Sequence, residues 1–129
     1  MNDQYGHLSG DAALRAFADH LRDAVRRTDI VARYGGEEFG LIFPETTGED
    51  AELKLDRVRE QVAARPIQLP RFGQSLSLTF SAGIASLPDD GDRVEDLVLR
   101  ADARLLAAKA TGRNRVLGPA DVEPRPNGR

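Results

Sequence analysis

A glycine pair followed by two carboxylates is the part of the sequence best suited to chemistry. Gly35 and Gly36 carry no Cβ, so the backbone can turn there with positive φ and a bulky ligand can approach its N–H groups. Glu37 and Glu38 follow at once, and carboxylates are ligands that a hard divalent cation such as Mg²⁺ prefers. Backbone amides beside a carboxylate therefore suit a metal-bound phosphate. The same residues are also compatible with a plain Gly-Gly hairpin turn that carries solvated glutamates.

A second polar cluster runs from Asn2 to Asp11, ahead of the first apolar helical pattern. Asn and Asp side chains can recognise guanine, because a carboxylate accepts hydrogen bonds from N1–H and N2–H of that base. In the alternative interpretation, Asp11 caps a helix that starts at Gly10–Asp11 or interacts favourably with its dipole. We assign His7 a structural role within this loop.

Cationic residues gather at two further places. Lys109 and Arg113 lie at the C-terminal end of a predicted helix, where they either complement its dipole or bind a triphosphate. Arg26 and Asp29 are three residues apart and form either a surface ion pair, worth roughly 0–1 kcal/mol, or part of an anion site. With Arg57 on the next helix, that site would bind an anionic ligand that contains a purine.

Helices and strands must position these side chains, and the spacing of apolar residues predicts where the helices and strands lie in the sequence. Three segments repeat apolar residues at steps of three and four, which is typical of amphipathic helices. Gly112 predicts the end of the last one, and Pro66 stops the second. The periodic positions are Leu14, Phe17, Leu21 and Val25 in the first segment, Ala51, Leu55, Val58 and Val62 in the second, and Val94, Leu97, Ala101, Leu105 and Ala108 in the third.

Other segments have the patterns of β-strands. Residues 39–43 form a near-continuous apolar run, which predicts a strand covered on both faces. Residues 76–84 alternate between apolar and polar, which is the period of a strand. Residues 30–32 predict a strand that pairs with 39–43 in a hairpin whose tip is Gly-Gly-Glu-Glu. Residues 115–117 predict a short last strand.

The order helix, hairpin, helix, strand, helix, short strand predicts an α/β fold, an α+β sandwich with helices packed on a sheet. We expect one more strand in that sheet, because three helices would otherwise cover too few strands. Residues 118–129 contain three Pro, two Gly and one large apolar residue, so we predict a disordered tail after a single domain that spans residues 1–117.

The composition argues against several classes of protein. The chain has 129 residues, which is room for one domain of ordinary size. Its net charge of −3 argues against a nucleic-acid partner. The absence of Cys excludes a disulfide framework and is compatible with a cytoplasmic location. No apolar run approaches the ~18 residues needed to cross a bilayer, so we expect no membrane segment.

Taken together, the motifs resemble those of the GGDEF-domain family of diguanylate cyclases, in its Gly-Gly-Glu-Glu-Phe variant. The resemblance runs from Asn2 to about Leu117 and implies the palm-like fold found in nucleotide cyclases and polymerases. The motifs that carry it are Asn2-Asp3…Gly6-His7…Gly10-Asp11, Arg33-Tyr34-Gly35-Gly36-Glu37-Glu38-Phe39, Ser81-Ala82-Gly83-Ile84-Ala85, and Arg100-Ala101-Asp102…Ala108-Lys109-Ala110-Thr111-Gly112-Arg113-Asn114.

The resemblance implies an enzyme that condenses two GTP molecules into cyclic di-GMP and releases two pyrophosphates. The implied cofactor is Mg²⁺, with Mn²⁺ as the alternative. The implied assembly is a head-to-head homodimer, in which the 3′-OH of one GTP meets the α-phosphorus of the other, under the control of an upstream sensor or receiver domain. The alternative function is an inactive module that binds GTP or cyclic di-GMP and signals through a partner.

Roles carry over to the residues that match the motifs. Asn2 and Asp11 are expected to bind guanine, and Gly35 and Gly36 to admit the phosphates. Glu37 is expected to coordinate the metal and to act as the base for the 3′-OH.

The remaining matched residues complete the implied sites. Glu38 is expected to support the metal and phosphate region less directly. Lys109 and Arg113 are expected to bind the terminal phosphates. The family's product-inhibition site, where cyclic di-GMP binds away from the active site, is matched by Arg26, Asp29 and Arg57.

The sequence departs from the family pattern in two places. The family carries a strand with a metal-binding Asp, usually followed by Phe-Lys, ahead of the Asn-Asp pair, whereas this sequence opens at Met1, one residue before Asn2. We therefore expect a GGDEF domain cut short at its N-terminus, with neighbouring strands left unpaired and a rate lowered by orders of magnitude. Leu106 stands where many members carry Tyr.

Overall fold

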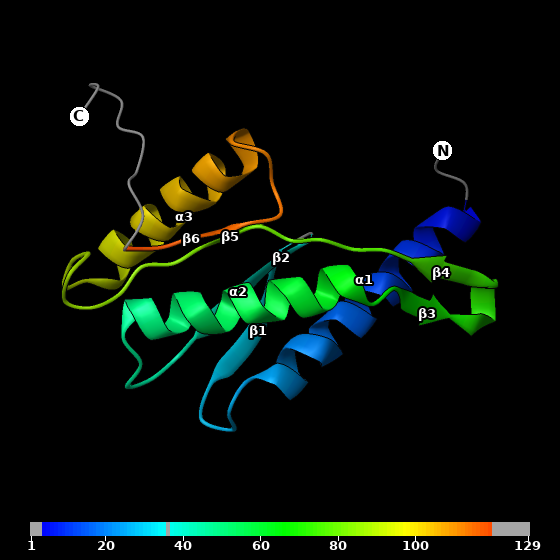
Figure 1. The fold of residues 1–129 in the computed structure, drawn as a ribbon, viewed down its shortest axis with the longest axis horizontal. Coiled ribbons are helices and arrows are strands. Elements are labelled where there is room, and N and C mark those ends of the chain that lie inside the picture. Colours follow the sequence, from blue (N-terminus) through cyan, green and yellow to red (C-terminus); the bar gives the residue numbers. More distant parts are fainter. Residues whose placement is uncertain (1–3, 36, 120–129) are drawn as a thin grey trace. The chain divides into compact units, whose positions relative to one another are not determined.

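The structure is a computed structural model that describes residues 4–35 and 37–119, with side chains described except at 4–9 and 74. The chain divides into two compact units, residues 1–45 with 62–78 and residues 46–61 with 79–129. The elements in chain order are α1 (Gln4–Ala24), β1 (Ile30–Gly35), β2 (Glu38–Ile42), α2 (Gly48–Ala64), β3 (Ile67–Leu69), the 3₁₀ turn η1 (Pro70–Phe72), β4 (Gln74–Leu76), β5 (Ala82–Gly83), α3 (Val94–Ala110) and β6 (Val116–Leu117) (Figure 1).

Helix α1 begins earlier than its sequence predicts. The predicted start at Gly10–Asp11 is wrong, because the helix runs from Gln4 through Gly6 and Gly10 to Ala24. A glycine in a helix interior costs only about 1 kcal/mol relative to alanine, so these two glycines weaken the helix without ending it. Asp11 consequently lies well inside the helix, where it cannot cap the N-terminus.

The first unit contains the predicted hairpin, which packs on α1. Strands β1 and β2 are antiparallel, with Val31 opposite Leu41 and Gly35 opposite Glu38. The rings of Phe17 in α1 and Phe39 in β2 meet edge to face, with centroids 5.4 Å apart. An aromatic pair of this geometry adds about 0.5–1.5 kcal/mol beyond area burial and ties the hairpin to the helix.

The prediction that both faces of residues 39–43 are covered is wrong. Phe39, Leu41 and Phe43 are half-buried, whereas Gly40 and Ile42 are exposed, with Ile42 at 58%. The burial pattern has the two-residue period of a strand with one covered face. The apolar run alone did not reveal this, because β-branched residues also occupy exposed positions of hairpins.

A second hairpin in the first unit was not predicted. Strands β3 and β4 are antiparallel, with Ile67 opposite Leu76, and η1 connects them. Gly73 ends the turn with φ 63°, a conformation that favours glycine. The Pro70–Gly73 segment is a turn signal that would have predicted this hairpin.

The second unit contains most of α2, and in it α3 packs on the parallel strands β5 and β6. The predicted buried positions of α2 are confirmed, since Ala51, Leu55 and Val58 are buried, as is Val62 in the first unit. The N–H of Asp50 donates to Oγ1 of Thr47 at 3.0 Å, which caps the helix start. Helix α3 contacts both β5 and β6.

The single sheet that the sequence predicts is not found among residues 4–35 and 37–119. The ladders instead form three separate pairs, β1–β2, β3–β4 and the parallel β5–β6. The predicted strand at 76–84 is paired only near its ends, in β4 and β5. Its alternation is nevertheless visible, because residues 76, 78 and 80 are half-buried and 75, 77 and 79 are exposed. The short last strand is confirmed as β6.

Close approach of α3 to β5 depends on Gly83. A Cβ at this position would collide with backbone atoms of α3, the carbonyl oxygen of Ala101 and the nitrogen of Leu105. Backbone atoms cannot rotate away as a side chain can, so any larger residue must displace the helix.

We therefore expect Gly83→Ala to destabilise the fold by about 1–3 kcal/mol, the usual cost of overpacking. Thermal unfolding followed by circular dichroism measures this effect. Gly40→Ala in β2 is the matched control, because a Cβ there meets no atom of the described residues within 4 Å beyond its chain neighbours. Equal melting temperatures for the two variants would contradict the role of Gly83.

One predicted apolar position of α3 is wrong, and one buried position was not predicted. Val94, the first residue of the helix, is 73% exposed, whereas Ala108 is fully buried. Arg104 is buried although it is charged. Its guanidinium donates two 2.9 Å hydrogen bonds to the carboxylate of Asp90 and one of 2.6 Å to the carbonyl oxygen of Ile84, so the buried charge is paired.

Two further predictions concern the ends of the chain and the membrane. The predicted tail begins at Gly118, which is buried, and its residues 120–129 lie outside the described residues. Within residues 4–35 and 37–119, no helix combines the length and the apolar character that crossing a membrane requires.

Candidate functional site

The two glutamates of the Gly-Gly-Glu-Glu motif lie at the tip of the first hairpin. Because Gly35 pairs with Glu38, Glu37 lies at the tip of the hairpin, and Gly36 lies outside the described residues. Gly35, Glu37 and Glu38 are all exposed. Apart from its chain neighbours, no described residue has an atom within 4 Å of the position that a Cβ on Gly35 would occupy, so the backbone is open to a ligand here.

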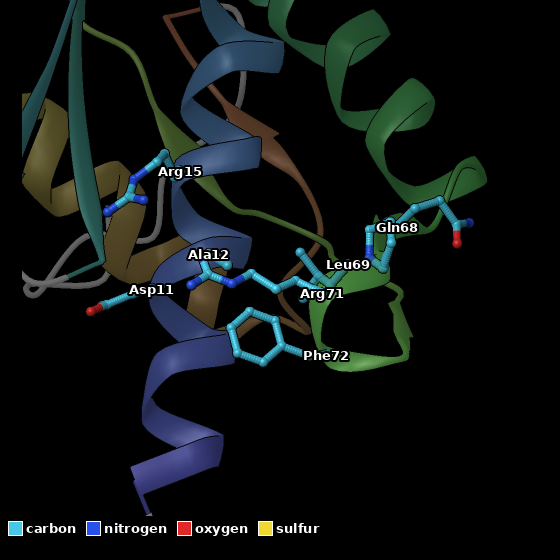
Figure 2. A pocket seen from close by; sticks show the side chains of 8 residues that line it. Asp11, Ala12, Arg15, Gln68, Leu69, Arg71 and Phe72 are labelled. Carbon is cyan, nitrogen blue, oxygen red and sulfur yellow. The ribbon is translucent and has the colours of Figure 1, made fainter.

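Asp11 borders an open pocket in the first unit. The pocket, of about 280 Å³, lies between α1 and the turn η1. In Figure 2, Arg71 and Phe72 reach from the turn toward α1, which carries Asp11 and Arg15. Asp11 is exposed and makes no ion pair with any residue that the structure describes, so its carboxylate is available to a ligand. The lining residues are Asp11, Ala12, Arg15, Gln68, Leu69, Pro70, Arg71 and Phe72.

Sequence reasoning missed the part of this pocket that comes from residues 68–72. The turn adds an arginine and an aromatic ring to the lining, side chains that can contact a planar polar group. The Pro70–Gly73 turn signal would have predicted the hairpin, although no local pattern predicts that it contacts α1.

Lys109 and Arg113 lie at the C-terminal end of α3, in the second unit. The N–H of Arg113 donates to the carbonyl oxygen of Ala108 at 2.9 Å, and Gly112 follows the cap with φ 124°. The hydrogen bond from Arg113 is the one that closes a Schellman motif, so the prediction that Gly112 ends the helix is confirmed. The cations at this helix end also interact favourably with its dipole.

Arg26 and Asp29 form a turn between α1 and β1. The N–H of Arg26 donates to Asp29 at 2.8 Å, its guanidinium reaches the same carboxylate at 3.2 Å, and the N–H of Asp29 donates back to the carbonyl oxygen of Arg26 at 3.0 Å. The guanidinium also donates to the carbonyl oxygen of Pro44 at 2.8 Å. The side chain of Asp29 is 0% exposed and that of Arg26 51%. Asp29 therefore stabilises the turn, and only Arg26 presents polar surface to a ligand.

The structure divides the expected site residues between the two units. The first unit contains Asp11 and the hairpin glutamates together with Arg26 and Asp29, and the second contains Lys109, Arg113 and the exposed Arg57. Asn2 lies outside the described residues, as does the side chain of His7.

The carboxylates that the structure describes do not form a metal cage. No group of three or more His, Asp or Glu side chains is placed to bind an ion within residues 4–35 and 37–119. Mg²⁺ in nucleotide sites is bound by one or two carboxylates together with substrate phosphates and water. Glu37 and Glu38 at an open hairpin tip fit that mode of binding.

Comparison with known proteins agrees with these motifs. A family model described as "Diguanylate cyclase, GGDEF domain" matches residues 1–115. The chain belongs to the GGDEF family. The response regulator PleD of Caulobacter vibrioides is 42% identical over 120 residues, which cover 93% of this chain and 26% of PleD. This GGDEF domain thus spans about a quarter of the length of that relative.

Solved structures of GGDEF domains have the same α+β, palm-like fold. The GGDEF domain of DgcB from Caulobacter crescentus, in complex with c-di-GMP, matches with a TM-score of 0.79 and 34% identity, over 91% of this chain and 68% of that one. The active GGEEF domain of a diguanylate cyclase from Vibrio cholerae matches with a TM-score of 0.80 and 30% identity, over 94% and 75%.

Proposed function

We propose that this GGDEF domain is a diguanylate cyclase that condenses two GTP molecules into cyclic di-GMP and releases two pyrophosphates. The observation that supports it best is the exposed Glu37 at a hairpin tip that packs, through Phe39, on the same helix that carries Asp11. A rigid contact between these elements suits a site that must recognise a base and position its phosphates together.

Each group of residues has a separate task in binding GTP. Asp11 accepts hydrogen bonds from guanine, together with Asn2. Gly35 and Gly36 let the phosphates approach the backbone at the hairpin tip. Lys109 and Arg113 neutralise the terminal phosphates, for which two cations at one helix end are suited.

The reaction requires two domains that face each other as a homodimer. The 3′-oxygen of one GTP attacks the α-phosphorus of the other, a new P–O bond forms, and the bond to the bridging oxygen of pyrophosphate breaks. Glu37 accepts the proton of the 3′-OH, and Glu38 adds negative charge beside it. A divalent cation, which we assign as Mg²⁺, supplies neutralisation of the phosphate charge when it is bound. A second, symmetric attack closes the ring.

Incubation of the purified protein with GTP and Mg²⁺, followed by chromatography, tests the proposal. Cyclic di-GMP and two equivalents of pyrophosphate are expected. Saturable GTP binding without any product would instead favour a module that binds nucleotide without turnover.

We also propose that Arg26 contributes to a product-binding site, together with Arg57. Arg26→Ala should abolish saturable binding of cyclic di-GMP away from the active site, measured by isothermal titration, and leave GTP binding unchanged. Asp29→Ala should lower the melting temperature of the protein, because the buried Asp29 carboxylate stabilises the turn. Unchanged cyclic di-GMP binding by the Arg26→Ala variant would count against this site.

A further inference from the structure

The turn after α3 has an unusual backbone at the residue proposed to bind phosphate. Arg113 and Asn114 have positive φ angles of 61° and 50°. Residues other than glycine visit this region only at a cost, so the surrounding structure must hold them there. The backbone angles of these two residues set the direction in which the Arg113 side chain projects from the turn.

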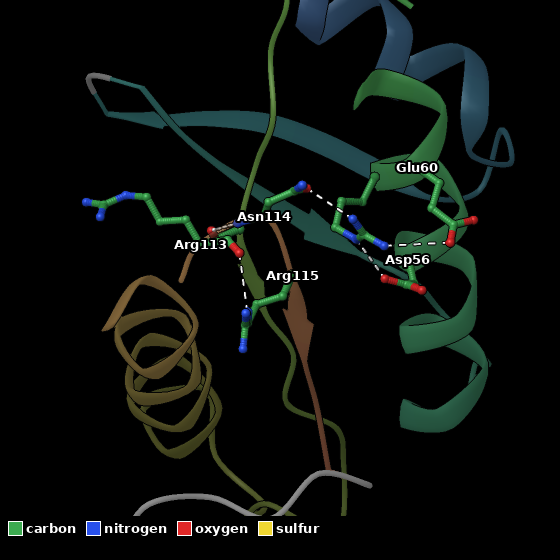
Figure 3. A network of polar contacts seen from close by, with 7 residues as sticks. Asp56, Glu60, Arg113, Asn114 and Arg115 are labelled. Carbon is green, nitrogen blue, oxygen red and sulfur yellow. Dashed lines mark hydrogen bonds and ion pairs between the residues drawn. The ribbon is translucent and has the colours of Figure 1, made fainter. Parts of the chain in front are cut away.

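Hydrogen bonds from three directions hold the turn (Figure 3). The N–H of Asn114 donates to Oγ of Ser81 at 3.1 Å, and Nε of Arg115 donates to the carbonyl oxygen of Arg113 at 3.3 Å. The third comes from α2, where Nη1 of Arg59 donates to Oδ1 of Asn114 at 3.0 Å. It is the one bond among these that reaches the Asn114 side chain.

Arg59 is itself paired with two carboxylates of its own helix. Its Nε donates to Asp56 at 2.8 Å, its Nη1 donates to Asn114, and its Nη2 lies 3.7 Å from Glu60 in an ion pair. Its side chain is only 17% exposed. Two carboxylates balance its charge, which suits a structural anchor better than a phosphate ligand.

Arg113 has the opposite surroundings. It is exposed, and Figure 3 shows its side chain extending away from the network on the far side of the turn. Its guanidinium makes no ion pair within the part of the chain that the structure describes. The Arg113 guanidinium therefore projects without an ion pair to any described residue, from a turn that the paired Arg59 guanidinium helps to hold in place.

We propose that Arg59 is a positioning residue for Arg113, acting through the side chain of Asn114. The proposal rests on the proposed function, in which Arg113 binds the terminal phosphates of GTP. Arg59 stabilises the left-handed conformation of Asn114 and so reduces the freedom that Arg113 loses when it binds a triphosphate. Sequence reasoning did not single out Arg59, because its partner is 55 residues away.

The test measures how strongly the purified protein prefers a non-hydrolysable GTP analogue to GMP, by equilibrium titration with Mg²⁺. Arg113→Ala sets the scale and should reduce this preference about tenfold or more, as expected for a lost charge-assisted contact. Arg59→Met and Asn114→Gly should each reduce it by roughly three- to tenfold and leave GMP affinity unchanged. Gly adopts positive φ freely, so Asn114→Gly keeps the turn accessible while it removes the contact.

Three further variants separate positioning from a general structural effect. Asn114→Asp tolerates the same backbone and offers Arg59 an acceptor, so it should retain the wild-type preference. Glu60→Gln removes only the long ion pair of Arg59 and keeps its hydrogen bonds to Asp56 and Asn114, so the preference should stay close to that of the wild type. Arg59→Met should cause no additional loss in a protein that already carries Arg113→Ala, because the two residues act through one contact.

The outcomes distinguish this inference from the proposed function. If Arg113→Ala reduces the preference for triphosphate but Arg59→Met and Asn114→Gly do not, the positioning role is overturned and the proposed function stands. If Arg113→Ala leaves the preference unchanged, the phosphate-binding role of Arg113 and the positioning role fail together. An equal loss of GTP and GMP affinity in the Arg59→Met and Asn114→Gly variants also overturns the inference, since that is the result of a merely structural role.

Discussion

The Glu37→Gln variant is expected to form cyclic di-GMP about 10²–10⁴ times more slowly than the wild type, the usual contribution of a positioned general base. Glutamine has the same shape but carries no negative charge, so it can neither accept the proton of the 3′-OH nor bind a divalent cation strongly. Mg²⁺-dependent binding of the triphosphate should be lost with the activity. The fold should remain intact, because Glu37 is exposed and forms no ion pair with any described residue.

Initial rates at several Mg²⁺ concentrations, with thermal melts as the test of folding, measure this effect. Glu49→Gln is the matched control, because it neutralises another exposed glutamate, in the first turn of α2, that does not belong to the Gly-Gly-Glu-Glu motif. Its rate should equal that of the wild type. A Glu37→Gln variant that kept the wild-type dependence on Mg²⁺ would remove Glu37 from the proposed site.

The largest expected effect on stability comes from the ion pair between α3 and the segment before it. Arg104→Ala should destabilise the fold by about 3–5 kcal/mol near neutral pH, as is typical when one partner of a buried pair is removed. The side chains of Arg104 and Asp90 are 5% and 6% exposed, so the substitution would leave a carboxylate buried without its main partner. The carbonyl oxygen of Ile84 would lose its donor as well.

Denaturant unfolding at neutral pH measures this loss. Arg100→Ala is the control, because its guanidinium lies 3.9 Å from Asp90 and is 46% exposed. Because Arg100 is half exposed and its contact with Asp90 is long, we expect its loss to cost only about 1 kcal/mol. Similar losses for the two variants would contradict the special role of Arg104.

The same pair makes stability depend on pH. The hydrogen bonds from Arg104 lower the pKa of Asp90 below its ordinary value of 3.8; burial opposes them, and the N–H of Ser86 and the charges of Arg104 and Arg100 add to them. A carboxyl with a lowered pKa in the folded state stabilises the fold fully above its ordinary pKa. That stabilisation is lost as the pH falls through the native pKa.

Unfolding free energies measured from about pH 5 downward should therefore fall more steeply for the wild type than for Asp90→Asn. Asn cannot titrate, so the variant is less stable at neutral pH but lacks this part of the acid dependence. Identical slopes would show that Asp90 does not gain stability from ionisation.

Local patterns were sufficient to predict much of the scaffold. The buried positions of α2 follow from a strict apolar spacing, the end of α3 from Gly112, and the first hairpin from paired apolar runs around two glycines. Each of these depends on residues close together in the chain. The family motifs are local in the same sense, which is why the GGDEF assignment needs no coordinates.

Two predictions were wrong because the residue types on which they rest only weakly favour one structure: the start of α1 and the burial of residues 39–43. The predicted start of α1 at Gly10–Asp11 treated glycine as a boundary, although its cost within a helix is small. The apolar run at 39–43 did not reveal which face is covered, because residue type alone does not report the neighbours of a strand.

By itself, the sequence determined the family, the hairpin that carries Glu37, and the presence of three helices, since each follows from the types and spacing of neighbouring residues. Only the tertiary structure decided that Arg104 is buried against Asp90, that Asp29 closes a turn, and that Arg59 reaches Asn114. In the contacts of Arg104 and Arg59, folding brings together polar groups that lie far apart in the sequence. The sequence around a charged residue does not indicate which distant residue will form its hydrogen bond or ion pair.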